Sequence, residues 1–153
     1  NTTLVIKTKS LKAKEVMESL NAELIGTGGN GFCESDHYFH YQLGIVDVEI
    51  ISGFRVKTFN AEYVYSYNSK EIDFCTIYEE EKITIPMIPV EAQYLLYRMM
   101  CWFEPNRRIK ADFISLYLQN YGLEHLVVFE KALAQKLPYW AIDEVKDFMK
   151  GGQ

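Results

Sequence analysis

The hydrophobic pattern of the chain is mainly strand-like before Pro89 and helical after it, and this change limits the fold more than any other feature. Before Pro89, short runs of apolar and β-branched residues alternate with polar ones, the period of strands half-buried in a sheet. After Pro89, apolar residues recur every three or four positions, and no alternating segment follows. A block of strands followed by a block of helices indicates α+β architecture.

The first block is predicted to contain strands and one helix. Residues 3–8 are β-branched and apolar and predict a strand. Residues 11–25 predict an amphipathic helix that begins after Ser10 and ends at the glycine-rich stretch 26–31. Residues 54–67 fit neither period, so both a short helix and a strand stay open there. Further strands are predicted at 38–43, 45–51, 71–78 and 81–86, with turns at Gly44 and at Glu79-Glu80.

The second block predicts four helices, at about 89–103, 105–121, 123–136 and 138–150. Prolines stand in their first turns and glycines at two of their ends, as Pro89, Pro105, Pro138, Gly122 and Gly151. The apolar stripes that we expect to face the core include Leu95, Leu96, Met99, Phe113, Leu116 and Leu126. We therefore expect a single α+β domain over 1–153 with a mixed sheet, strand-rich at 1–88 and helical at 89–153.

Net charge, hydropathy and cysteine content indicate which partners and which cellular compartment to expect. The net charge of −5 repels phosphate backbones and anionic lipid, so nucleic acid is not an expected partner. No run of about 18 apolar residues predicts a membrane span. The 3 cysteines are widely spaced and fit reduced thiols, which indicates the cytoplasm. The chain begins with Asn1, which indicates processing or a segment upstream.

Two acidic residues on one predicted strand form the first candidate site. Alternation along 45–51 places Asp47 and Glu49 on one face of the strand, about 7 Å apart, and Val46, Val48 and Ile50 on the other. Paired carboxylates suit a divalent metal ion that neutralises charge on an attacked phosphate. The alternative is an ordinary solvated strand face.

A basic cluster at the start of the second predicted helix forms the other candidate site. It contains Arg107, Arg108 and Lys110, followed by Asp112. Cations at a helix start oppose the helix dipole, which indicates that another partner holds them there. The alternative is a basic surface turn.

The order of these features resembles the second half of small nucleotidyltransferase-fold proteins. In that family a late acidic strand precedes an "ipvlspE" turn and a helix that ends near an R-x-K-D segment. Here the strand with Val48-Glu49-Ile50 is followed by Ile83-Thr84-Ile85-Pro86-Met87-Ile88-Pro89-Val90-Glu91, then by Asn106-Arg107-Arg108-Ile109-Lys110-Ala111-Asp112. The resemblance covers roughly residues 38–120 and implies a nucleotidyltransferase-like α+β fold.

The resemblance implies metal-assisted transfer of a nucleotide from an NTP, with Mg²⁺ as cofactor. Glu49, or Asp47 in the alternative alignment, matches the last of the family's three carboxylates, so both are candidate catalytic and metal-binding residues. Arg107 and Lys110 are the candidate nucleotide-binding residues. The family's aspartate strand corresponds to residues 2–8, which carry no acid. Either further sequence precedes Asn1 or the catalytic set is incomplete, and the second hypothesis is a non-catalytic protein-binding module on the same fold.

Overall fold

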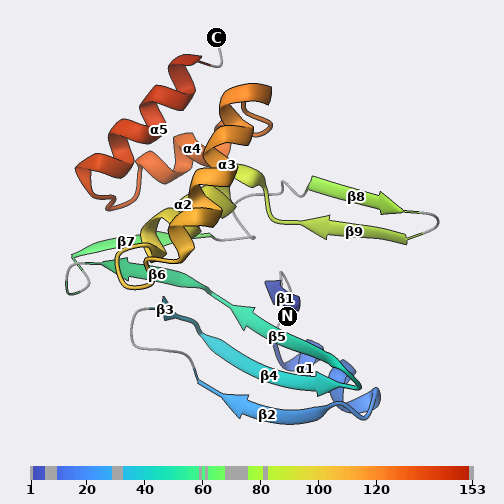
Figure 1. Cartoon of the computed structure of the whole chain (residues 1–153). Coiled ribbons are helices and arrows are strands. Elements are labelled where there is room, and N and C mark those ends of the chain that lie inside the picture. Colours follow the sequence, from blue (N-terminus) through green and yellow to red (C-terminus); the bar gives the residue numbers. More distant parts are fainter. Residues whose placement is uncertain are drawn as a thin grey trace. The chain divides into compact units, whose positions relative to one another are not determined.

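The computed structural model of the chain describes residues 2–5, 10–28, 33–58, 60, 62–67, 76–80 and 83–151. It confirms the α+β class, with its helices mainly in the carboxy-terminal half (Figure 1). The chain forms two compact units, residues 1–55 with 66–71, and residues 56–65 with 72–153. The second unit therefore takes in part of the segment predicted to be strand-rich. A single domain over 1–153 stays a prediction.

The first unit is built on a mixed four-stranded sheet in the order β1-β5-β4-β2. β1 (Thr2–Val5) runs parallel to β5 (Val46–Ser52), whereas β4 (His37–Leu43) runs antiparallel to both β5 and β2 (Glu23–Thr27). The β4–β5 hairpin turns at Gly44, whose φ of +61° lies in the left-handed region that glycine adopts at little cost. The predicted strands 38–43 and 45–51 are thus confirmed, and β5 lies between two partners.

Helix α1 (Ser10–Ser19) covers one face of this sheet (Figure 1). Met17 on the helix packs with Tyr41 of β4 and with Val48 and Ile50 of β5, and all four side chains are buried. Each of the two strands contributes alternate residues to this core, as the period-two pattern predicts. The opposite face of the same strands carries the polar side chains.

The predicted helix 11–25 is wrong beyond Ser19. Asn21 adopts a φ of +56°, a conformation in which asparagine commonly follows the end of a helix. The chain then re-enters the sheet as β2, so Leu24 and Ile25 lie in a strand and Gly26 lies within it. The glycine-rich stretch therefore does not end the helix, and residues 29–32 lie outside the described part.

The remaining strands form short ribbons. Residues 54–67, left open by the sequence, contain β6 (Arg55–Thr58) and its neighbour β7 (Tyr63–Ser66). β8 (Thr76–Glu80) pairs antiparallel with β9 (Ile83–Met87), which confirms a hairpin between the last two predicted strands. Glu79 and Glu80 belong to β8 rather than to the turn, and residues 71–75 lie outside the described part. A two-residue strand, β3 (Cys33–Glu34), precedes β4.

All four predicted carboxy-terminal helices are present in the second unit. They are α2 (Val90–Met100), α3 (Arg107–Tyr121), α4 (Leu126–Leu133) and α5 (Tyr139–Gly151). Pro89 directly precedes α2, Pro138 directly precedes α5, and Gly122, with a φ of +80°, caps α3. α2 contacts each of the other three helices. Their core includes Leu95, Met99, Ala111, Leu118, Val128, Phe129 and Val145. No helix among the described residues has the length and apolar character needed to cross a membrane.

Candidate functional site

Asp47 and Glu49 lie side by side on β5, as the alternation predicted. Both side chains are half-buried, while Val48 and Ile50 point to the opposite face and into the core under α1. Val46 was expected in that core, but 44% of its surface is exposed because it stands at the hairpin turn. The structure therefore confirms one shared face for the two acids on an interior strand.

Each acid is engaged by a side chain of β4. The Tyr38 hydroxyl donates a hydrogen bond to Glu49 Oε1 at 3.0 Å. His40 Nε2 lies 3.6 Å from Asp47 Oδ1, and His40 also stands opposite Glu49 in the strand register. Burial, together with the hydrogen bond and the negative charge of Glu49, raises the pKa of Tyr38 to about 12.

The residues at this face do not fit a metal centre of the kind that nucleotidyl transfer uses. Such a centre needs clustered oxygen ligands around its ions. Beside Glu49, the parallel strand β1 places Thr3, which brings no carboxylate. In the part of the chain that the structure describes, no three histidine, cysteine or acidic residues stand together in a way that would hold a metal ion. We therefore derive no reaction step through a metal here.

The Tyr38–Glu49 hydrogen bond should give the stability of the chain a distinctive alkaline dependence. Because the folded pKa of Tyr38 is raised from 10.0 to about 12, the bond contributes fully below pH 10 and its contribution is lost as pH rises through 12. Tyr38→Phe should therefore lower the free energy of unfolding below pH 10, and this difference should shrink toward pH 12. Denaturant unfolding of both chains across this range measures it, and a difference independent of pH would contradict the assignment.

Arg107 and Lys110, the predicted nucleotide-binding residues, lie at the start of α3 in the second unit. Arg107 Nε donates to Glu104 Oε2 at 2.6 Å, and the Lys110 ammonium lies 5.2 Å from the centre of the Tyr97 ring. Asp47 and Glu49 belong to the first unit. The two predicted pairs therefore belong to different units of the chain.

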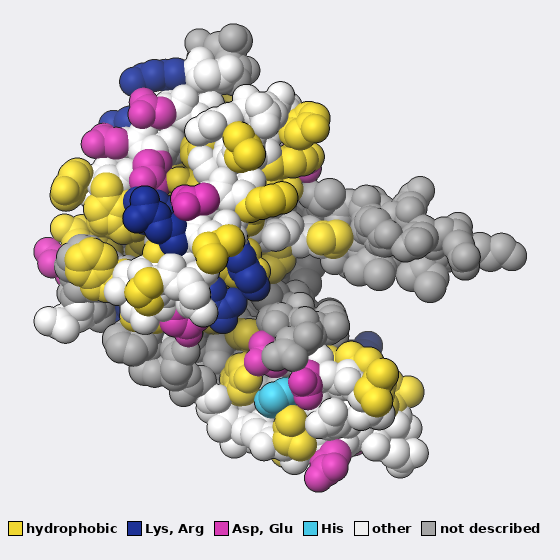
Figure 2. Space-filling view, in the orientation of Figure 1, with side chains coloured by type: hydrophobic (Ala, Val, Ile, Leu, Met, Phe, Trp, Pro, Cys, Tyr) yellow, Lys and Arg dark blue, Asp and Glu magenta, His cyan; other side chains and the backbone are white. Residues whose placement is uncertain are grey.

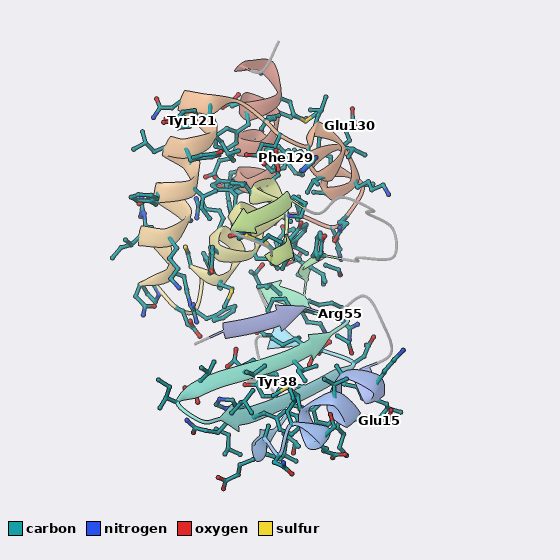
Figure 3. All side chains as sticks on the ribbon, turned by 90° about the vertical axis from the view of Figure 1, so that its right-hand side faces the viewer. Glu15, Tyr38, Arg55, Tyr121, Phe129 and Glu130 are labelled. Carbon is teal, nitrogen blue, oxygen red and sulfur yellow. The ribbon has the colours of Figure 1, made fainter. Side chains whose placement is uncertain are left out.

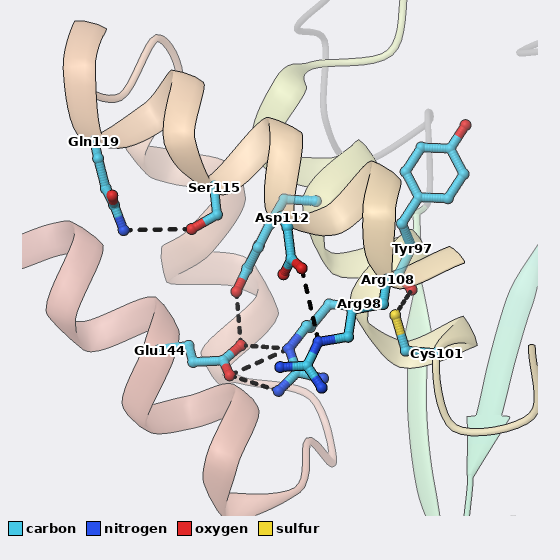
Figure 4. A network of polar contacts seen from close by, with 9 residues as sticks. Tyr97, Arg98, Cys101, Arg108, Asp112, Ser115, Gln119 and Glu144 are labelled. Carbon is cyan, nitrogen blue, oxygen red and sulfur yellow. Dashed lines mark hydrogen bonds and ion pairs between the residues drawn. The ribbon is translucent and has the colours of Figure 1, made fainter. Parts of the chain in front are cut away.

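A groove of about 800 Å³ lies among α2, α3 and α5 (Figure 4). Two of its lining residues, Arg98 and Glu144, form a bidentate ion pair, with Nη2 2.7 Å from Oε1 and Nε 2.9 Å from Oε2. The Tyr94 hydroxyl donates to Glu144 Oε2 at 2.6 Å, and the guanidinium of Arg98 lies 4.4 Å from the centre of the Trp140 ring. Burial and the bond to Glu144 raise the pKa of Tyr94.

Four of the charged side chains that line this groove are paired with one another. Besides Arg98 with Glu144, Arg108 lies 3.7 Å from Asp112 on the next turn of α3, and Gln119 donates to Ser115 at 3.4 Å (Figure 4). A bidentate pair that joins α2 to α5 serves to align helices. We interpret this network as part of the packing of the second unit.

The exposed face of α3 departs most from the sequence prediction. Phe113 and Leu116 were expected to face the core, yet 77% and 56% of their surfaces are exposed. Leu126 on α4 is also exposed, whereas Leu95, Leu96 and Met99 are buried as predicted. The core contacts of α3 come instead from Ala111 and Leu118, which are fully or almost fully buried. The helix has two apolar stripes, and its periodicity did not show which one faces inward.

Four large side chains spaced by four residues form a continuous row on this exposed face. We call this row the α3 ridge; it consists of Ile109, Phe113, Tyr117 and Tyr121, with exposures of 73%, 77%, 37% and 77%. The rings of Tyr117 and Tyr121 lie 4.9 Å apart, and the Tyr117 hydroxyl donates to Glu124 at 2.8 Å. Hydrophobic side chains also gather on the surface of the helical unit in the space-filling view (Figure 2).

Glu91 is a buried polar residue that was noted in the sequence only as part of the proline-rich motif. Its side chain has 0% exposure, and Oε1 accepts hydrogen bonds from the backbone N–H groups of Glu124 and His125 at 2.6 and 2.7 Å. These groups stand immediately before α4, so Glu91 ties α2 to the start of that helix. The feature of the sequence that could have indicated this role is the acidic residue directly after Pro89-Val90.

Comparison of the chain with models of protein families, with curated proteins and with solved structures found no match in any of the three.

Proposed function

We propose that this chain is a non-catalytic protein-binding module whose docking surface is the α3 ridge. The observation that supports it is the row of large apolar side chains exposed on one helix whose opposite face is anchored in the core. Soluble proteins rarely expose a continuous apolar surface unless it meets a partner. Tyrosine and phenylalanine are also among the residues enriched at the centres of protein interfaces.

The geometry of the ridge favours a helix as the partner. Residues spaced by four form one of the surface rows of an α-helix, and such rows pack into the grooves of a second helix. α3 has 15 residues, a length of about 22 Å, which accommodates several turns of a partner's apolar face. The contact between the tilted rings of Tyr117 and Tyr121 and the hydrogen bond to Glu124 limit the rotamers that binding would have to order.

A selection of helix-forming peptides displayed against the whole chain tests this proposal. We expect the selected peptides to carry apolar residues at three- and four-residue spacing and to lose about 30-fold in affinity, equal to about 2 kcal/mol, for Phe113→Ser. Tyr139→Ser is the matched control, because Tyr139 is 76% exposed on α5, outside the ridge. Peptides that bind the Phe113→Ser chain as tightly as the parent would contradict the proposal.

Metal-assisted nucleotidyl transfer is the second candidate function, with an NTP as substrate and Mg²⁺ as cofactor. The observation that favours it is the pairing of Asp47 and Glu49 on one face of an interior strand of a mixed sheet. It requires carboxylates beyond those that the structure brings together. Incubation with labelled NTP, magnesium and protein or RNA acceptors tests it. Transfer lost in Glu49→Gln but retained in Glu15→Gln, an exposed acid on α1, would support it, and no transfer above background would contradict it.

Under either candidate function, we propose that the protein is located in the cytoplasm, as its cysteine content predicts.

A further inference from the structure

We draw no further inference here: the strongest candidate, the groove of about 800 Å³ among α2, α3 and α5, is lined by charged side chains that are already paired within the second unit, and nothing in the structure shows what ligand it would hold.

Discussion

Replacement of Glu91 by alanine is expected to lower the free energy of unfolding by about 2–5 kcal/mol. The side chain is fully buried, and its Oε1 is the acceptor for the N–H groups of both Glu124 and His125. Alanine leaves these two donors without that acceptor, and each unsatisfied buried group costs about 1–3 kcal/mol. Equilibrium denaturation measures the effect.

Glu91→Gln separates the hydrogen bonds from the loss of volume. Glutamine keeps a carbonyl oxygen that can accept from the same N–H groups, so its destabilisation should be clearly smaller than that of alanine. Glu130→Ala, at an exposed position on α4, should change stability by less than about 0.5 kcal/mol. An unfolding midpoint of Glu91→Ala equal to that of the parent would show that the buried carboxylate does not support the fold.

Phe129→Ala is expected to be at least as damaging, with a loss of about 3–5 kcal/mol. Phe129 has 0% exposure and lies among the helices of the second unit (Figure 3). Its ring lies 6.4 Å from that of Tyr94 on α2, at 72°, and 5.9 Å from that of Phe148 on α5, at 29°. The three rings join α2, α4 and α5, so truncation leaves a cavity where three helices meet. Thermal or chemical denaturation that showed a loss below about 1 kcal/mol would contradict this packing.

The hairpin around Gly44 and the four carboxy-terminal helices could be predicted because local signals were sufficient. The alternation in 45–51 matched the pleat of β5, and the prolines and Gly122 marked where helices begin and end. The paired positions of Asp47 and Glu49 followed from the same period. These elements are determined by residues that are close to one another in the sequence, so a single sequence is enough to predict them.

The side of α3 that faces the core could not be predicted, because that choice depends on residues distant in the sequence. Ile109, Phe113 and Leu116 have the helical spacing of a core stripe, yet the smaller stripe through Ala111 and Leu118 packs against the rest of the second unit. The small side chain of Ala111 suits the close approach of α2, the main neighbour of α3. Leu116→Ala would cost about 2–5 kcal/mol in a core but should cost little at 56% exposure.

Strand β2 was missed for a related reason. Leu24 and Ile25 continue the apolar spacing of α1, so the pattern alone predicted a longer helix. The positive φ of Asn21 ends that helix, and pairing of Leu24 with Tyr41 places the next segment in the sheet. The asparagine after the apolar turn was a local signal for the end of the helix. It does not reveal the pairing of Leu24 with Tyr41, which is a long-range contact.

We propose that the α3 ridge binds a partner, and its exposed Phe113 is expected to contribute little to the stability of the single chain. The most direct test is the free energy of unfolding of Phe113→Ser, measured at a concentration where the chain is monomeric. At 77% exposure, this change should leave the value within about 0.5 kcal/mol of the parent chain. A loss of about 3 kcal/mol or more would place Phe113 in a packed interior and contradict the claim.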